Sequence, residues 1–262
     1  MKISLIITTY NNERYLELSL KSVMRQTRMP DEIIIADDGS RAATAELIER
    51  IRPLFSCPIV HIWQEDKGFR KTKILNKAFA KSTGDYIICI DGDIICDRHF
   101  IEDHEHFALK GCFSVGSRVR LSEKNSAKIA DDGNIERLRF LHVSTDSPFN
   151  ALRCPSLTPL FYNTLRCRGC NLAFWKDDIV RINGYDERFE GYGHEDLELV
   201  GRLAMSGLRN RYLRFAAIEY HLWHKLVDAT GEQFKENFRL CNELLAKGQY
   251  RTECGMSQYL QP

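Results

Sequence analysis

Short apolar segments alternate with helical segments over the first hundred residues, and this alternation restricts the fold more than any other feature of the sequence. Four segments have the length and β-branched content of buried strands, namely residues 3–9, 32–36, 59–63 and 86–90. Apolar residues with helical spacing separate them, over residues 16–24, 43–51 and 71–81. Strands that alternate with helices form a mostly parallel sheet covered on both faces. We therefore predict an α/β fold with a Rossmann-like, mostly parallel central sheet flanked by helices.

A polar cluster follows each of the predicted strands. The clusters are Thr8, Thr9, Tyr10 and Glu13 after the first strand, Asp37 and Asp38 after the second, residues 66–70 after the third, and Asp91 and Asp93 after the fourth. Ligands of open α/β sheets bind beyond the carboxyl ends of the strands, which lie along one edge. The sequence therefore predicts a ligand site at that edge.

The pair Asp91 and Asp93 is the most informative of these clusters. The two acids flank Gly92 and follow the apolar run at residues 86–90 directly. Carboxylate oxygens suit Mg²⁺ or Mn²⁺, which then bridge to phosphate oxygens of a substrate. Gly92 lets the backbone turn there while both acids face one cleft. An ordinary polar turn, in which acids and glycine are common, is the alternative interpretation.

Composition and missing motifs exclude several classes of function. The formal net charge is +1 and the basic residues are scattered, so we expect no nucleic-acid partner. The sequence contains neither a Gly-x-Gly-x-x-Gly dinucleotide motif after the first strand nor a Gly-x-x-x-x-Gly-Lys-Ser/Thr phosphate loop. Cys167 and Cys170 form a single Cys-x-x-Cys pair, which is weak support for zinc, and we expect reduced, structural thiols.

The sequence shows no secretory leader and no apolar run near the ~20 residues that cross a bilayer. We therefore expect a cytoplasmic protein, either soluble or peripheral at the inner face of the cell membrane. Residues 137–168 interleave apolar and basic side chains with prolines. Such a segment suits an anionic membrane surface, a lipid-linked glycan acceptor, or a mobile acceptor lid.

Three motifs resemble the nucleotide-sugar half of family 2 glycosyltransferases with the GT-A fold. They are Thr8-Thr9-Tyr10-Asn11-Asn12-Glu13, Asp37-Asp38-Gly39-Ser40 and Asp91-Gly92-Asp93. Residues 183–196, which contain Asn-Gly-Tyr-Asp-Glu-Arg-Phe and then Gly-Tyr-Gly-His-Glu-Asp, are similar to the acceptor-side segment of β-galactosyltransferases and chondroitin-synthase-like enzymes. The motifs cover about residues 1–225.

The resemblance implies a single GT-A domain over residues 1–262 with a smaller acceptor-side subdomain. We expect a nucleotide-sugar half over residues 1–110, an acceptor and catalytic half over 111–230, and a C-terminal helix and tail over 231–262. The amphipathic helix that follows Gly231 would pack on the domain or on a second subunit, so a homo-oligomer is one expectation.

The same resemblance implies a donor site. Thr8, Tyr10, Glu13 and Asp38 are the expected contacts of the base and ribose. Arg70 and Lys73 lie three residues apart on one helical side and can meet the diphosphate or the sugar, whereas Lys71 fits a solvated charged face. The full set of expected donor contacts is Thr8, Thr9, Tyr10, Glu13, Asp37, Asp38, Arg70, Lys73, Asn76, Asp91, Gly92, Asn171 and Gly193.

The resemblance also implies a cation. Asp93 would bind Mn²⁺ or Mg²⁺ directly, and Asp91 would contact the ribose or reach the ion through water. His221 and His224 are two candidates for a further ligand, with His221 preferred because it stands nearer the end of the predicted strand at residues 213–219. Imidazole beside carboxylates favours Mn²⁺.

Two acids in the second half are the candidate catalytic residues. Asp196 is the expected general base, which takes the proton of the acceptor hydroxyl, and Glu195 would orient hydroxyl groups. Both also suit a helix start, where acids interact well with the helix dipole. Tyr192 and His194 stand where β-galactosyltransferases carry tryptophan and glycine. The donor and acceptor preference of those enzymes therefore does not transfer, and His194 itself is a candidate for phosphate contact.

The predicted function is inverting, metal-dependent transfer of a sugar from a nucleotide sugar, with UDP as the expected carrier, to a hydroxyl of a glycan or glycolipid acceptor. Synthesis of cell-surface polysaccharide or lipopolysaccharide is the expected setting. The alternatives are a sugar nucleotidyltransferase and a noncatalytic nucleotide-sugar or carbohydrate-binding protein. The first alternative would need a glycine-rich loop with arginine after the first strand, which this sequence lacks.

Overall fold

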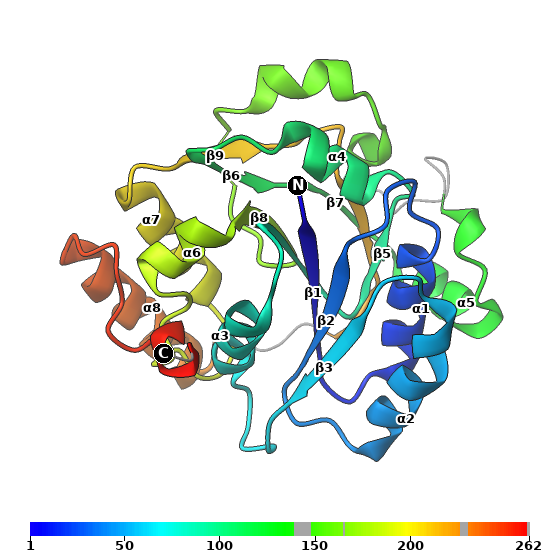
Figure 1. Cartoon of the computed structure of the whole chain (residues 1–262), viewed down its shortest axis with the longest axis horizontal. Helices are drawn as coiled ribbons and strands as arrows, with labels where there is room; N and C mark the ends of the chain where they lie inside the picture. Colours follow the sequence, from blue (N-terminus) through cyan, green and yellow to red (C-terminus); the bar gives the residue numbers. More distant parts are fainter. Residues whose placement is uncertain (139–147, 165, 226–229, 261–262) are drawn as a thin grey trace.

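A seven-stranded sheet forms the centre of the protein, as seen in a computed structural model that describes residues 1–138, 148–164, 166–225 and 230–260 (Figure 1). The strand order is β3-β2-β1-β4-β8-β6-β9. The strands are β1 (Ile3–Thr9), β2 (Glu32–Asp37), β3 (Ile59–Trp63), β4 (Tyr86–Asp91), β6 (Cys112–Val115), β8 (Asn171–Trp175) and β9 (Arg209–Tyr212). The first four pair in parallel, and β8 runs antiparallel to both β4 and β6. The predicted α/β class is confirmed.

Helices cover both faces of this sheet because its central strands β1, β2 and β4 are apolar on both sides. They are α1 (Glu13–Val23), α2 (Ala42–Ile51), α3 (Lys71–Lys81), α4 (Phe100–Phe107), α5 (Glu123–Asp132), α6 (Lys176–Ile182), α7 (Glu195–Met205) and α8 (Glu232–Ala246). Leu5 and Ile7 pack with α1, α2 and α4 on one face, and Ile6 packs with α3, α6 and α7 on the other. Short 3-10 helices lie in the connecting segments of the described residues, at Arg52–Leu54, Ile135–Arg137, Pro148–Ala151, Pro155–Phe161 and Met256–Tyr259.

The register of the parallel strands brings the polar clusters together. Thr8 lies opposite Asp91 on one side and opposite Ala36 on the other, and Thr9 lies opposite Asp37. At the start of α1 the Asn12 side chain accepts a hydrogen bond from the Tyr15 backbone N–H, as its capping position predicts. The carboxyl ends of β1, β2 and β4 therefore meet at one edge of the sheet.

A second, three-stranded sheet lies beside this edge, in the order β5-β10-β7. Its strands are β5 (Ile94–Cys96), β7 (Ser117–Arg120) and β10 (Ile218–His221). The predicted strand at residues 213–219 is wrong in its first part, because Phe215 and Ala217 have positive φ and form a turn. His221 pairs with Ile94, and the Leu222 backbone N–H donates to the Asp93 carbonyl at 3.0 Å. The small sheet thus holds His221 next to Asp93.

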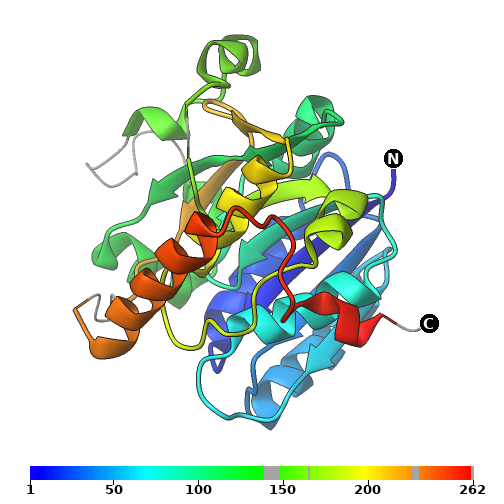
Figure 2. The same ribbon diagram turned by 90° about the vertical axis from the view of Figure 1, so that its left-hand side faces the viewer.

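The C-terminal helix α8 packs within the chain. Cys241 and Leu244 form a small apolar cluster with Phe189, and Figure 2 shows α8, in orange, beside α7, in yellow. The outward face exposes Phe238. No helix among the described residues combines the length and the apolar character needed to cross a bilayer.

Candidate active site

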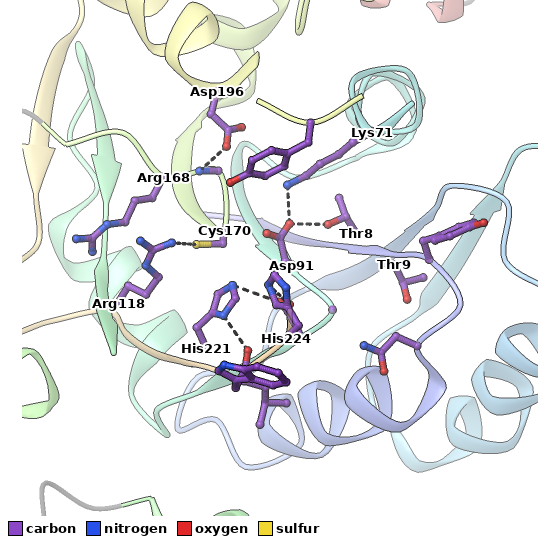
Figure 3. Close-up of a pocket in the computed structure, with 18 of the residues that line it drawn as sticks. Thr8, Thr9, Lys71, Asp91, Arg118, Arg168, Cys170, Asp196, His221 and His224 are labelled. Carbon is purple, nitrogen blue, oxygen red and sulfur yellow. Dashed lines mark hydrogen bonds and ion pairs between the residues drawn. The ribbon is translucent and has the colours of Figure 1, made fainter. Parts of the chain in front are cut away.

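A cavity of about 870 Å³ opens where the carboxyl ends of β1 and β4 meet β7, β10 and the start of α7 (Figure 3). The predicted site residues that line it are Thr8, Thr9, Tyr10, Asp38, Asp91, Gly92, Asp93, Glu195, Asp196, His221 and His224. Segments from both halves of the chain contribute, so the fold gathers these side chains around one space. A Cβ on Gly92 would lie 2.8 Å from the Thr8 carbonyl oxygen, so a larger residue after β4 would clash with the backbone at the end of β1.

Asp91 is held by two donors on the floor of the cavity. The Thr8 hydroxyl donates to its Oδ1 at 2.7 Å, and the Lys71 Nζ lies 2.7 Å from the same oxygen. Burial raises the pKa of the Asp91 carboxyl, but Lys71 and Thr8 outweigh burial and hold that pKa below its ordinary value. The solvated face that the sequence suggested for Lys71 is therefore wrong, because the first turn of α3 points this ammonium into the cavity.

Asp93 lies against two imidazoles. Its Oδ1 is 3.7 Å from His221 Nε2, and its Oδ2 is 3.4 Å from His224 Nε2. In each ring the Nδ1 lies 3.0 Å from a backbone carbonyl, that of Leu222 or Lys225. A carbonyl only accepts, so Nδ1 carries the proton and the Nε2 lone pair is left free toward Asp93.

These three side chains fit a divalent cation. One ligand atom from each of Asp93, His221 and His224 lies within 4.8 Å of the other two. Asp93 Oδ1 is buried without a hydrogen-bond partner, which is costly for a carboxylate unless a ligand satisfies it. Burial raises the pKa of Asp93, and the nearby imidazoles partly offset this effect. Both histidines named from the sequence face the same aspartate, so the arrangement does not require a choice between them.

Asp196 and Glu195 begin α7 at another wall of the cavity. Asp196 Oδ1 accepts from the Tyr185 hydroxyl at 2.8 Å, and its Oδ2 accepts from the Gly169 backbone N–H at 3.0 Å. These donors fix the carboxylate in one orientation. Glu195 Oε2 accepts from the Gly193 N–H at 3.1 Å, and burial together with repulsion from Asp196 raises the pKa of Glu195 to about 7.

Thr9, Tyr10 and Asp38 form the other end of the cavity. Asp38 accepts hydrogen bonds from the Gln64 amide at 2.6 Å and from the Arg70 backbone N–H at 2.7 Å, and burial raises its pKa. Tyr10 is half exposed and donates to Asp66 at 2.9 Å. This end presents an aromatic ring and oxygen acceptors, which suit a nucleoside.

Two asparagines expected at the donor do not reach the cavity. Asn76 is fully buried; its amide donates to the Tyr185 carbonyl at 2.9 Å and to Glu187, and its oxygen accepts from the Tyr185 N–H at 2.8 Å. Asn171 is also fully buried, and it donates to the Ala217 carbonyl at 2.9 Å and contacts His104 at 3.0 Å. Both side chains join separate segments in the interior, so we correct their expected role.

Two other predicted contacts are used for local structure near the nucleoside end. Glu13 accepts from the Thr44 hydroxyl at 2.6 Å, which links α1 to α2. Asp37 accepts from the Ser40 N–H at 2.7 Å and contacts His61 at 2.9 Å. Neither acid lines the cavity, and Asp37 instead borders a separate hollow of about 360 Å³.

The basic residues ranked highest from the sequence also lie outside the cavity lining. Arg70 is the N-cap of α3, and its guanidinium donates to the Glu65 carbonyl. Lys73 likewise does not line the cavity. The error was one of helical phase, because Lys71, and not Arg70 or Lys73, occupies the turn that faces Asp91.

Gly193 and His194 shape the loop before α7 without lining the cavity. Gly193 has a φ of 109°, and a Cβ there would lie 2.5 Å from the Phe234 ring. The His194 ring packs on Phe234 and Phe238, with centroid separations of 4.5 and 5.1 Å. The phosphate contact suggested for His194 is therefore not supported by its position.

Several other residues line the cavity that were not among the predicted site residues. They are Lys71, Arg118, Arg120, Arg168, Cys170, Tyr192 and Trp223. Arg118 and Arg120 share one face of β7 because they are two residues apart in a strand. Their alternation with apolar Val119 is a weak signal, and only the pairing of β7 with β10 brings them to this site.

The chain belongs to glycosyl transferase family 2, whose family model matches residues 4–161. A second family model, described as the N-terminal domain of galactosyltransferase, matches residues 158–225. The two matches together cover the segments on which the sequence resemblance rested.

Individual relatives are distant. Validoxylamine A glucosyltransferase of Streptomyces hygroscopicus subsp. limoneus is 26% identical over 229 residues, which cover 79% of this chain and 48% of that protein. Chondroitin synthase of Pasteurella multocida is 24% identical over 239 residues, which cover 78% of this chain and 23% of that protein. The chain thus spans less than half the length of these curated relatives.

Solved structures share the fold. S. aureus TarS 1-349 in complex with UDP-GlcNAc has a TM-score of 0.64 at 18% identity, covering 99% of this chain and 70% of that chain. The mannosyltransferase PcManGT of Pyrobaculum calidifontis, in complex with GDP-Man and Mn2+, has a TM-score of 0.59 at 17% identity, covering 95% and 62%. These likenesses confirm the predicted GT-A fold.

Proposed function

We propose that this chain transfers a sugar from a nucleotide sugar to a hydroxyl of a glycan or glycolipid acceptor, with inversion at the anomeric carbon and with a divalent cation. The observation that carries the proposal is the placement of Asp93, His221 and His224 in the same cavity as the anchored carboxylate of Asp196. A noncatalytic binding protein would need the three residues that hold the cation, but it would not need the carboxylate of Asp196.

Asp93, His221 and His224 would hold the cation, and Mn²⁺ is preferred because two of the three ligands are imidazoles. A bound cation supplies positive charge that stabilises the departing nucleoside diphosphate. The Mn2+ named with PcManGT supports this assignment by analogy of fold. Asp91 Oδ1 is held by Thr8 and Lys71, so Asp91 would keep that ammonium beside the leaving group.

The donor base and ribose would lie at the end formed by Thr9, Tyr10 and Asp38. Tyr10 presents a ring for stacking, and Asp38 presents carboxylate oxygens to an imide N–H or ribose hydroxyls. The UDP-GlcNAc named with S. aureus TarS supports UDP as the carrier. The sugar would then point past the cation ligands toward Asp196.

Asp196 would act as the general base. Its two hydrogen bonds orient the carboxylate, and an acceptor hydroxyl that gives up its proton there attacks the anomeric carbon opposite the diphosphate. Attack from that face inverts the configuration. Glu195, whose pKa of about 7 keeps part of its population protonated at neutral pH, would donate a hydrogen bond to a sugar hydroxyl.

Within this proposal, residues 1–110 bind the nucleotide and residues 111–230 supply most of the acceptor and catalytic side. The expectation for the segment 137–168 falls partly on residues 139–147 and 165, which lie outside the described residues. In the described part, Phe149, Leu157 and Leu160 are exposed. We retain contact with a glycan or lipid-linked glycan, in cell-surface polysaccharide synthesis, as the proposed setting.

The test is release of free nucleoside diphosphate from a panel of sugar nucleotides, with Mn²⁺ or with chelator, and with and without oligosaccharide acceptors. We expect UDP release that requires Mn²⁺ and rises with acceptor. Release of pyrophosphate instead would indicate a sugar nucleotidyltransferase. Binding without any release, across donors and acceptors, would indicate a noncatalytic protein.

A further inference from the structure

Three arginines that form no ion pair within the described part of the chain line one side of the cavity. Arg118, Arg120 and Arg168 all border the cavity, and none forms an ion pair with an Asp or Glu among the described residues. Lys71, on the same cavity, is paired with Asp91 at 2.7 Å. The unpaired positive charge is therefore concentrated on the β7 side and at the segment before β8.

Figure 3 shows Arg118 and Arg168 on the same side of Asp91 and His221, with the Arg118 guanidinium directed toward Cys170. The Arg118 Nη1 lies 3.8 Å from the Cys170 sulfur, and sulfur is a weak acceptor. The Arg168 Nη1 is buried and has no hydrogen-bond partner. An unsatisfied guanidinium N–H group is costly to bury, because it has lost water and gained no acceptor. Both arginines therefore have donors to spare for a ligand.

The nearest buried acid does not neutralise them. Glu219 is fully buried, and its carboxyl forms no ion pair with Arg118 or Arg168 within the described residues. One Glu219 oxygen is contacted by the Cys170 thiol at 3.1 Å, and the other has no partner. The guanidinium donors of Arg118 and Arg168 are therefore not taken up by this acid.

The position of these arginines separates them from the nucleoside end. In Figure 3 Arg118 and Arg168 lie on the opposite side of Asp91 and His221 from Thr9. Asp196 lies nearby, because it accepts the N–H of Gly169, which follows Arg168 directly in the chain. A ligand group held by the two guanidiniums would therefore lie on the side where the sugars react.

We propose that Arg118 and Arg168, with Arg120 at the rim, bind an anionic group, a carboxylate or a phosphate, on one of the sugar substrates. The inference rests on the proposed function and adds a substrate class to it. Planar guanidiniums bind carboxylate and phosphate oxygens through paired, charge-assisted hydrogen bonds. The anion belongs either to the transferred sugar of the donor or to the acceptor near its reacting hydroxyl.

The experiment compares matched substrates in two arms. The donor arm uses UDP-glucuronic acid against UDP-glucose, and the acceptor arm uses a uronic-acid hexasaccharide against its carboxyl-reduced form and a phosphorylated oligosaccharide against its phosphatase-treated form. Affinity is measured by calorimetry with Mn²⁺, and with UDP present in the acceptor arm. In one arm we expect the wild type to prefer the anionic member at least tenfold, which corresponds to about 1.4 kcal/mol.

The variants are the double substitution R118Q/R168Q and, as a matched control, R166Q. Arg166 stacks on the same Tyr212 ring as Arg168 but does not line the cavity. We expect R118Q/R168Q to reduce the preference to within about twofold and R166Q to keep it, since one charge-assisted hydrogen bond accounts for a tenfold effect. The charge-retaining pair R118K/R168K, checked for folding by circular dichroism, should keep part of the preference.

Three results would overturn the proposal. They are no anionic preference in any wild-type arm, a preference that survives R118Q/R168Q, or an equal loss of affinity for UDP itself, which would assign the arginines to the diphosphate. Failure of the proposed function is recognised separately, because wild-type protein with Mn²⁺ would then release no UDP from any donor, with or without acceptor.

Discussion

Glu195 provides a prediction whose size can be worked out from the structure. Its carboxyl is nearly fully buried at the start of α7, and burial and the Asp196 carboxylate raise its pKa from 4.5 to about 7, against a smaller opposing effect of Lys71. A raised acid pKa means that the folded state binds the proton more tightly than the unfolded state. Stability is therefore lost as the pH rises from about 4.5 to about 7, and the loss is complete above that value.

The substitution Glu195→Gln removes this titration and keeps the shape of the side chain. Its amide oxygen can still accept from the Gly193 N–H. With the two pKa values above, the raised pKa of Glu195 lowers the free energy of unfolding of the wild type by about 1.4 kcal/mol at pH 5.5 and by about 3.4 kcal/mol at pH 8.5, relative to low pH. The free energy of unfolding of the variant, relative to wild type, should thus rise by about 2 kcal/mol between these pH values.

The assay is urea unfolding at several pH values between 5.5 and 8.5, in chelator and without donor, for both proteins. Glu49→Gln is the control, because Glu49 is exposed and Arg52 lowers its pKa, so any pH trend should have the opposite sign. A stability difference that stays constant over this range, or that falls as the pH rises, would refute the reasoning about Glu195.

Three further predictions concern two residues of the site and the buried Asn76. Asp196→Asn should lower kcat by ~10² to 10⁴ while UDP with Mn²⁺ still raises its melting temperature; a kcat within a few-fold of wild type would remove Asp196 from the role of base. Lys71→Met leaves Asp91 without its cation, so the free energy of unfolding in chelator should fall by about 3 kcal/mol, and an unchanged value would contradict this pairing. Asn76→Ala breaks three buried hydrogen bonds and should cost ~3 kcal/mol of stability with an unchanged KM for the donor; a raised KM at full stability would return Asn76 to the donor site.

The first four strands, β1 to β4, could be predicted almost to the residue. Each is a short β-branched run that ends at a polar cluster, and local pattern is sufficient when both faces of a strand are buried. The pairing of β7 with β10 could not be predicted in this way. It joins segments about a hundred residues apart. The turn before β10 also needs positive φ at Phe215 and Ala217, which cannot be predicted from these residue types.

The site was predictable where strand ends carry it, as at Asp91 and Asp93, because parallel register alone brings those residues to one edge. It was not predictable where helical phase or burial decides the role. Lys71 and Arg70 are neighbours with similar chemistry, and only the start point of α3 selects which one faces Asp91. Asn76 carried a polar group that suits a ligand equally well, but the loop at Tyr185 occupies its donors and acceptor.

The central claim is that Asp93 and the two histidines hold a cation that positions the nucleotide diphosphate. The most direct measurement is electron paramagnetic resonance of Mn²⁺ titrated into the protein with UDP, for wild type, Asp93→Asn and the His221→Ala/His224→Ala pair. The account predicts that each wild-type chain binds one Mn²⁺ tightly when UDP is present. It predicts that both variants lose this bound ion. Equal Mn²⁺ binding by wild type and Asp93→Asn would contradict it.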